Sequence, residues 1–259
     1  MVGKRRISRM AGKLYMALIF IFLYAPIVTL IVLSFNESKF RGHWGGFSLK
    51  WYGRLFADKT IMDALATTLA IALLSALIAT ILGTVVSFAI SRMRKLPKTL
   101  LMSVTNIPML NADIVTGISL MLLFIAIHYT MGFSSVLLAH ITFNLPYVVL
   151  SVLPRLRQIN YSTYEAALDL GASKGYAFWK VIFPDIMPGI LTGFLLSFTM
   201  SLDDFVITHF TKGVGVDTLS TQIYAEARKG IKPEMYALST LMFVTVFVLL
   251  ILYNRKKER

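Results

Sequence analysis

Hydrophobic residues along this chain occur in six long blocks separated by shorter polar segments. The blocks run over about 14–35, 63–90, 100–127, 133–153, 187–210 and 235–253. An apolar block of roughly 18 or more residues is long enough to cross a bilayer as a helix. Lipid offers no hydrogen bonds to the backbone, so each block should satisfy its polar groups within one helix. The pattern predicts an all-α integral membrane protein with six transmembrane helices.

The first block follows a basic start, as the apolar region of a signal peptide does, but it is longer than such a region. No small-x-small cleavage site follows it, so we expect it to remain as the first span. The polar segment after it is longer than a hairpin needs. We expect a short surface helix at about 49–56 within that segment.

Composition agrees with a membrane protein and excludes other classes. The chain is 56% hydrophobic and 15% charged, whereas about a quarter of the residues of soluble domains are charged. Cysteine is absent and the four histidines show no ligand spacing, so we expect neither disulfides nor a metal site. No Ser-His-Asp or paired-carboxylate pattern indicates an enzyme, and we expect no catalytic residues.

The net charge of +13 comes mainly from basic residues that flank the apolar blocks. Such flanks are typical of the cytoplasmic side of a membrane, and no aromatic-basic platform predicts nucleic-acid binding. With the N-terminus inside, the cytoplasmic segments hold 17 Lys and Arg residues and the outer loops hold nine. We therefore expect residues 1–259 to form a single transmembrane domain with both termini in the cytoplasm.

The segment 154–186 joins the fourth and fifth blocks and lies in the cytoplasm in this topology. Its Glu-Ala-Ala run, beginning at Glu165, is strong helix-forming material. Gly171 follows where a helix would end through a left-handed residue, and Ser173 can cap a second helix. The segment therefore predicts two short helices.

Two prolines, Pro184 and Pro188, should end the second short helix and start the fifth span. The first helix presents a small apolar face made of Ala166, Ala167 and Leu170. Such a face suits a groove on a partner protein. An amphipathic helix lying on the membrane surface explains the same pattern.

Three carboxylates lie inside predicted spans, namely Asp113, Asp203 and Asp204. An acid at the bilayer centre costs roughly 2.5–3.5 kcal/mol on insertion scales, so it needs a reason to be there. Asp113 ends the polar, proline-interrupted stretch 106–113, which predicts a broken or kinked helix lining a cavity. A structural role, such as capping a broken helix, is the alternative for each acid.

No Lys or Arg lies within any predicted span to neutralise these acids. A path with fixed negative charge favours a positive substrate, and acids at separate positions suit a molecule with several amines. Phe143, Tyr147 and Phe205 could add aromatic faces that attract ammonium groups. Ordinary packing is the alternative for these aromatic residues.

The run of Glu-Ala-Ala, three residues and Gly-Ala between the fourth and fifth spans resembles the cytoplasmic loop of ABC importer permeases. The resemblance implies a role in coupling to ATPase subunits for the following residues: Glu165, Ala166, Ala167, Asp169, Leu170, Gly171 and Ala172. The chain has no Gly-x-x-x-x-Gly-Lys-Ser/Thr motif. We therefore expect it to bind no cofactor itself, with ATP and Mg held by a partner ATPase.

Stretches along nearly the whole chain resemble the permeases that import spermidine and putrescine. They include Leu-Ser-Phe-Asn near Ser34, Asp113-Ile-Val, and the runs that begin at His140 and Ser197. The resemblance implies a bacterial inner-membrane location. It also implies a sibling permease subunit forming a heterodimer, two ATPase subunits and an external polyamine-binding protein. A permease for another small solute and a proton-coupled secondary transporter are the alternatives.

Overall fold

A computed structural model describes residues 2–40, 42–230 and 232–257 of the 259-residue chain. Within these ranges the regular elements are all helices, and one isolated antiparallel bridge joins Asn36 to Phe47. The chain divides into two compact units, Met1–Met62 with Ile223–Arg259 and Asp63–Gln222. The prediction of a single domain for residues 1–259 stays a prediction.

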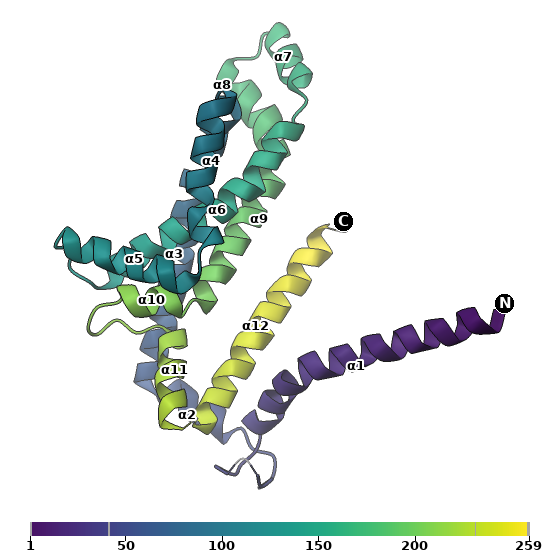
Figure 1. Cartoon of the computed structure of the whole chain (residues 1–259), viewed down its shortest axis with the longest axis vertical. Coiled ribbons are helices and arrows are strands. Elements are labelled where there is room, and N and C mark those ends of the chain that lie inside the picture. Colours follow the sequence, from purple (N-terminus) through teal and green to yellow (C-terminus); the bar gives the residue numbers. More distant parts are fainter. Residues whose placement is uncertain (1, 41, 231, 258–259) are drawn as a thin grey trace. The chain divides into compact units, whose positions relative to one another are not determined.

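The first unit contains α1 (Val2–Ser34), α2 (Lys50–Ala57), most of α11 (Leu219–Lys229) and α12 (Pro233–Lys257). The second contains α3 (Lys59–Arg92), which begins just before the boundary, α4 (Lys95–Leu110), α5 (Asp113–Ala126), α6 (Phe133–Gln158), α7 (Tyr161–Asp169), α8 (Lys174–Ala177), a π-helical turn (Phe178–Ile182), α9 (Phe183–Asp203) and α10 (Val206–Thr211) (Figure 1).

In the first unit, the chain between α1 and α2 folds around Asn36. The Asn36 side chain accepts hydrogen bonds from the backbone N–H groups of Ser38 and Gly45 and donates to the carbonyl of His43. The indole of the fully buried Trp51 donates to the Asn36 carbonyl at 2.6 Å. Trp51 belongs to α2, so the short helix predicted at 49–56 is confirmed.

A largely buried carboxylate lies in α11, close to the turn that leads to α12. Glu226 is 6% exposed, and the Lys232 ammonium lies 2.9 Å from its Oε2. Hydrogen bonding to Glu226 raises the pKa of Lys232 above its ordinary value. The charge pair therefore fixes the turn at the start of α12.

The core of the second unit lies where α6 packs against α3 and α9. A Cβ on Gly83 of α3 would lie 2.7 Å from the side chain of Val148 on α6. A Cβ on Gly193 of α9 would lie 3.1 Å from the Cα of the same Val148. Only glycine allows such a close approach of the helices. The buried cluster around Val148 consists of Ala79, Val152, Leu156, Ile159, Ile182 and Ile186.

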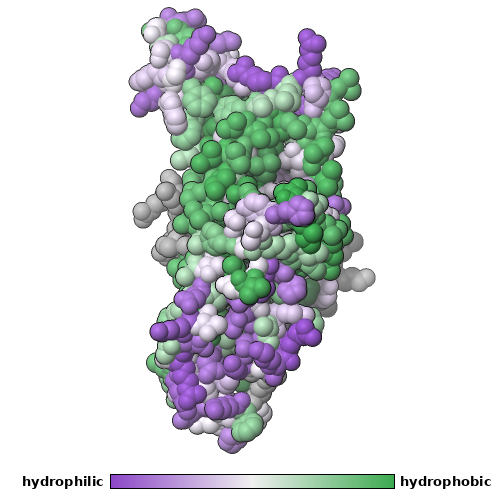
Figure 2. Space-filling view, turned by 90° about the vertical axis from the view of Figure 1, so that its left-hand side faces the viewer, coloured by the Kyte–Doolittle hydropathy of each residue, from purple (hydrophilic) through white to green (hydrophobic). Residues whose placement is uncertain are grey.

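Four stretches of the described chain are long and apolar enough to cross a membrane: Gly12–Ser34, Lys59–Arg92, Phe133–Gln158 and Lys174–Asp203. The helices α4 and α5 pass the same test together, although they meet at an angle of 107°. On the face seen in Figure 2, hydrophobic residues form a broad band below the hydrophilic end that α7 and α8 occupy. The all-α membrane fold is confirmed.

The count of six spans stays a prediction. The sixth predicted block coincides with α12, whose side chains at 246 and 249–257 lie outside the described residues. The third block, predicted at 100–127, is a bent pair of helices and not one straight span. Pro108 in the last turn of α4 and the non-helical residue Asn111 account for the interruption.

The prediction for the start of the fifth span was wrong. Pro184 and Pro188 do not end the short helix α8, because helical backbone runs without a break from Lys174 to Asp203. The π-helical turn Phe178–Ile182 lies just before Pro184, which occupies the second position of α9. A proline inside a helix has no N–H group to donate and its ring crowds the carbonyl four residues earlier, and the wider π turn gives that ring room. The far end was also overestimated, since α9 ends at Asp203 and not at 210.

Candidate functional site

Two helix breaks in the second unit hold all three of the intramembrane acids. The first break separates α9 from α10, with Asp203 as the last residue of α9 and Asp204 in extended backbone after it. The second break separates α4 from α5, with Asp113 as the first residue of α5. The prediction of a broken helix at 106–113 is therefore confirmed.

Asp204 is enclosed by hydrogen-bond donors. Its carboxylate accepts from the backbone N–H groups of Ile207 (3.2 Å) and Thr208 (2.7 Å), in the first turn of α10. It also accepts from the Thr208 hydroxyl at 2.8 Å, and the Nε2 of His140 lies 3.3 Å away. Because the side chain is only 6% exposed, Asp204 acts as a cap for α10 and as a partner of His140.

Asp203 has a different environment from its neighbour. Asp203 is exposed, although Ser201, two positions earlier in the same helix, is buried. Phe205, one residue beyond Asp204, is partly buried and its ring stacks on His209 with centroids 5.2 Å apart. At the α9–α10 break, therefore, Asp203 offers an exposed carboxylate and Asp204 does not.

Asp113 is also exposed and begins a helix whose first turn has no side-chain cap. Its charge interacts electrostatically with the hydroxyl of Tyr147 on α6. The Tyr147 ring packs edge-on against Phe143, with centroids 5.4 Å apart. The structure thus brings Asp113 and the two predicted aromatic residues of α6 into one neighbourhood.

Phe143 itself is a core residue. It is 5% exposed and belongs to a buried cluster with Phe124, Ala139 and Ile207, against which Tyr147 also packs. This packing joins α5, α6 and α10. Tyr147, which is only partly buried, is the better placed of the two to meet a solute.

Five further polar residues, for which no role was predicted, are linked to Asp204 directly or through one another by hydrogen bonds. These are His140 and Asn144 on α6, Ser75 on α3, Ser201 on α9 and Thr208 on α10, all of which are buried. His140 and Asn144 lie four residues apart on one face of α6, which is a signal in the sequence. The pairing with Ser75, more than 60 residues away, has no local signal.

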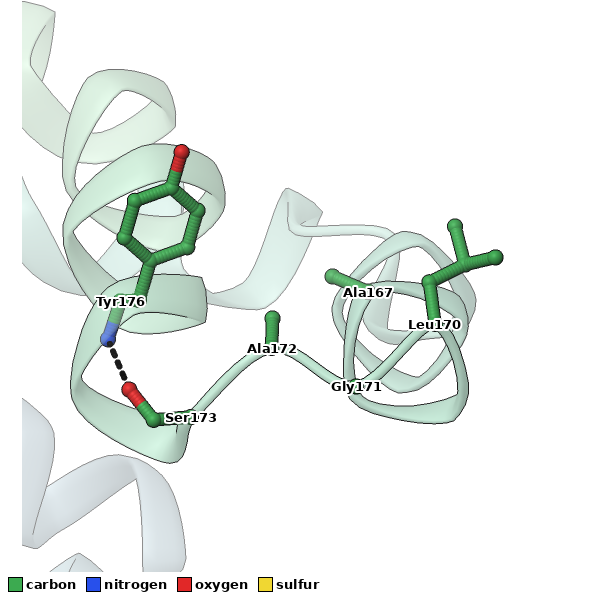
Figure 3. A pocket seen from close by; sticks show the side chains of 6 residues that line it. All are labelled: Ala167, Leu170, Gly171, Ala172, Ser173 and Tyr176. Atoms are coloured by element: carbon green, nitrogen blue, oxygen red, sulfur yellow. Dashed lines mark hydrogen bonds between the residues drawn. The ribbon is translucent and has the colours of Figure 1, made fainter.

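The first short helix predicted in the segment 154–186 is confirmed as α7, whereas the second begins as α8 and continues into α9. Gly171 has φ of +90°, which favours glycine, and Ser173 accepts a hydrogen bond from the Tyr176 N–H at 3.3 Å (Figure 3). In the same view, Ala172 lies between the end of α7 and Tyr176. Together with Ala167 and Leu170 these residues line an open surface pocket.

The residues predicted for coupling lie on the surface of this loop. Leu170 is 89% exposed, and Glu165, Ala166, Asp169 and Gly171 are exposed as well. Ala167 and Ala172 are partly buried. Leu170, Tyr176 and Trp179 are large hydrophobic side chains that remain exposed, and such side chains are typical of a surface that a partner or lipid covers.

The family model for the binding-protein-dependent transport system inner membrane component matches residues 79–255. The match includes both helix breaks and the whole α7–α8 loop. The chain belongs to this family, whose members are membrane components of transport systems, and the resemblance to importer permeases is confirmed.

Several relatives in this family are transport permeases of known name. The chain is 39% identical to the spermidine/putrescine transport system permease protein PotC of Haemophilus influenzae, covering 92% of this chain and 93% of the relative. It is 39% identical to PotC of Escherichia coli, with 95% and 93% covered. It is also 39% identical to the putrescine transport system permease protein PotI of Escherichia coli, with 88% and 83% covered.

Solved structures show the same fold. The chain matches a bacterial ABC transporter involved in the import of the acidic polysaccharide alginate with a TM-score of 0.74 at 16% identity, covering 98% of this chain and 96% of that one. A bacterial alginate ABC transporter in complex with its pentasaccharide-bound periplasmic protein gives a TM-score of 0.73, also at 16% identity, with 98% and 95% covered.

Proposed function

We propose that this chain is the transmembrane permease subunit of an ATP-driven importer that takes up polyamines, spermidine and putrescine among them. The observation that carries the proposal is the similarity to polyamine permeases over 88–95% of the chain. The geometry supports it, because Asp113 and Asp203 are exposed acids at two helix breaks. Two separated carboxylates match two amines of one substrate.

The exposed acids would act by binding and not by covalent chemistry. An ammonium group that leaves water needs a negative partner, and Asp203 and Asp113 would supply it in turn. Tyr147 would add an aromatic face close to Asp113, and Phe205 would add one within the α9–α10 break. Phe143 would support Tyr147 through their edge-on ring contact. Asp204 would keep α10 in position as its cap.

The partners in the proposal are a sibling permease subunit in a heterodimer, two ATPase subunits that hold ATP and Mg, and an external polyamine-binding protein. Named relatives serve spermidine/putrescine transport, and one related fold was solved with a periplasmic binding protein. Both termini lie in the cytoplasm of a bacterium whose inner membrane holds the chain, since the basic residues are biased to that side.

The α7–α8 loop would couple transport to ATP. ATP binding closes the ATPase dimer, which moves Glu165 to Ala172 and rocks the spans from an inward-facing to an outward-facing state. The exposed side chain of Leu170 would enter a groove on the ATPase. The open pocket beside it would receive a side chain of the ATPase in turn. The fixed left-handed turn at Gly171 would transmit the movement to α9 through the continuous helix that begins at Lys174.

The test of substrate and acid site is ATP-dependent uptake of labelled spermidine in cells that lack polyamine uptake. The chain is expressed with its neighbouring transport genes as wild type, Asp113→Asn, Asp203→Asn and Asp185→Asn. Asp185 is an exposed acid in the first turn of α9, about 27 Å from Asp203 at 1.5 Å per residue. We expect a loss of uptake of about tenfold or more at Asp113 and Asp203, and wild-type uptake with Asp185→Asn.

Uptake that survives Asp113→Asn and Asp203→Asn in assembled complexes would mean that these acids do not bind the substrate. The proposal that the chain is part of an importer would still stand. If a well-assembled wild-type complex takes up no spermidine, the substrate is another small solute. Uptake that continues without ATP but stops when the proton gradient is collapsed would support a secondary transporter instead.

The coupling loop has its own test. Gly171→Pro and Glu165→Lys should leave the complex inserted and assembled but remove substrate-stimulated ATP hydrolysis. Gly175→Ala is the control, because an added methyl there meets nothing within 4 Å and no left-handed backbone is required. Coupled uptake at the wild-type rate in Gly171→Pro would contradict the role of the loop.

A further inference from the structure

The buried polar residues around Asp204 form one continuous line of hydrogen bonds across four helices. It starts at Asn144, whose side-chain N–H₂ donates to Ser75 Oγ at 3.2 Å. Ser75 donates to Ser201 Oγ at 3.1 Å, and Ser201 lies 2.5 Å from His140 Nδ1. The line continues from His140 Nε2 to Thr208 Oγ1 at 2.9 Å and ends where Thr208 donates to Asp204.

The available protons fix the direction of the hydrogen bonds at the Asp204 end of this line. Thr208 spends its only hydroxyl proton on the Asp204 carboxylate, so it must accept from His140, and His140 therefore carries its proton on Nε2. Ser201 accepts from Ser75, and its Oγ also shares a hydrogen bond with His140 Nδ1. Both ring nitrogens of His140 therefore have a hydroxyl partner, and neighbouring hydrogen bonds in such a line polarise one another.

The line holds the chain on both sides of Asp203. Ser201 is fixed two residues before it and Asp204 one residue after it, while Asp203 itself is exposed. The break between α9 and α10 would otherwise leave this short segment free to turn. Its two anchors, Ser201 in α9 and Asp204 in the extended backbone after it, both lie against His140.

Packing alone does not require this arrangement. Buried polar groups cost free energy unless every one of them is satisfied, and apolar residues of similar size often hold helices together as well. Apolar side chains would leave the rotation of the segment around Asp203 undefined. Hydrogen bonds of fixed direction define it, which matters where one carboxylate has to meet an ammonium group.

We infer that His140 is a positioning residue for cation transfer, and that with Ser75, Asn144, Ser201 and Thr208 it fixes where Asp203 presents its carboxylate. The inference rests on the proposed function for its substrate, whereas the positioning of residue 203 can be measured without any substrate. His140 touches no solute in this assignment. It acts through Ser201 and Asp204.

The first test uses the absence of cysteine from the chain. In the assembled importer, Asp203→Cys is reacted with a water-soluble thiol reagent, alone and combined with His140→Leu. We expect the labelling rate at 203 to change at least threefold with His140→Leu. Thr199→Cys, on an exposed part of the same helix, should label at one rate in both backgrounds. Equal rates at 203 would overturn the inference, and a parallel change at 199 would do so too, since it would indicate general loosening.

The second test compares spermidine and putrescine uptake in proteoliposomes with the ATPase subunits and the binding protein, per assembled complex. His140→Leu should lower the maximal rate roughly tenfold, leave the KM for the loaded binding protein within twofold, and change the spermidine-to-putrescine ratio. His140→Gln, which keeps a donor for Thr208, should recover most of the rate. Thr142→Val is the control, because the Thr142 hydroxyl is exposed and bonds only within α6.

The outcomes separate the two proposals. If 203 labelling depends on His140 but no polyamine is taken up by the wild type, the positioning stands and the substrate is wrong. If polyamine uptake is normal and His140→Leu lowers both substrates only in proportion to lost complex, the proposed function stands and the positioning is overturned.

Discussion

The two helix breaks of the second unit are built in different ways. At the α9–α10 break, the carboxylate of Asp204 binds two backbone N–H groups and the Thr208 hydroxyl, and His140 closes the site. At the α4–α5 break, backbone bonds alone hold the turn, with the Ala112 carbonyl accepting from the N–H groups of Val115 and Thr116. No side chain caps the start of α5.

This difference shows how three acids in one membrane protein come to have two kinds of role. The carboxylate of Asp204 is engaged by hydrogen-bond donors, and these bonds make the α9–α10 break stiff. Asp203 is exposed at this stiff break. Asp113 is exposed at the α4–α5 break, which has no side-chain cap and is the soft break of the pair. A binding site made from both would have one fixed acid and one that can move, as a path that opens and closes requires.

The largest expected effect comes from making the stiff break soft. Asp204→Ala removes the cap of α10 and leaves the Thr208 hydroxyl and two backbone N–H groups buried without their acceptor. We expect the free energy of unfolding to fall by about 3 kcal/mol. Thermal unfolding of the purified protein in detergent should show it as a loss of about 6–12 °C in Tm.

Asp203→Ala is the matched control for that measurement. It removes the same carboxylate one residue away, at an exposed site. We expect a change within about 0.5 kcal/mol. Equal losses of Tm for the two substitutions would contradict the division of roles between neighbouring acids.

An intermediate effect is expected where the two breaks meet. Gly117 of α5 faces α10, and a Cβ there would lie 3.1 Å from the Phe210 ring and 3.4 Å from the Ile207 Cα. Gly117→Val should push α5 from α10 and destabilise the protein by about 2 kcal/mol, because the packed site has no room. The measurement is again Tm in detergent.

Ser119→Val serves as the control for the Gly117 substitution. It adds a similar bulk to an exposed position of the same helix, so the loss should be small. If Gly117→Val is as stable as the wild type, α5 adapts to the added volume and the contact with α10 does not define the soft break.

Local signals in the sequence predicted much of this architecture. The apolar blocks located the long helices, and Gly171 and Ser173 predicted the α7–α8 turn correctly because caps and left-handed residues act within a few positions. The stretch 106–113 predicted a break, but its angle of 107° could not be predicted. That angle depends on how α5 packs on α10, which no local pattern encodes.

Which of the two adjacent acids caps the break could not be predicted, for a similar reason. Two adjacent acids look alike in a sequence, and only the contacts with His140 and Thr208 separate them. The helix through Pro184 was missed because a proline normally ends a helix, whereas here it falls in the first turn after a π-helical segment. In both cases the tertiary setting decides between local options of similar energy.

The smallest effect is expected from making the soft break stiff. Ala112 occupies the N-cap position of α5, with φ of −63° and ψ of 139°, which suits a capping serine. The Oγ introduced by Ala112→Ser would accept from the N–H of Ile114 or Val115, as the Asp204 carboxylate does in α10. We expect a gain of about 0.5–1 kcal/mol in the free energy of unfolding, seen as a higher Tm in detergent.

The same substitution should cost transport, because a capped α5 bends less readily at the break that carries Asp113. ATP-dependent spermidine uptake per assembled complex should fall about two- to threefold while Tm rises. Ala126→Ser, at the last residue of α5, adds the same hydroxyl where no N–H group needs an acceptor, and should change neither quantity. A rise in Tm with undiminished uptake would mean that the α4–α5 break is static, and that the contrast between the two breaks lies in how they are capped and not in how they move.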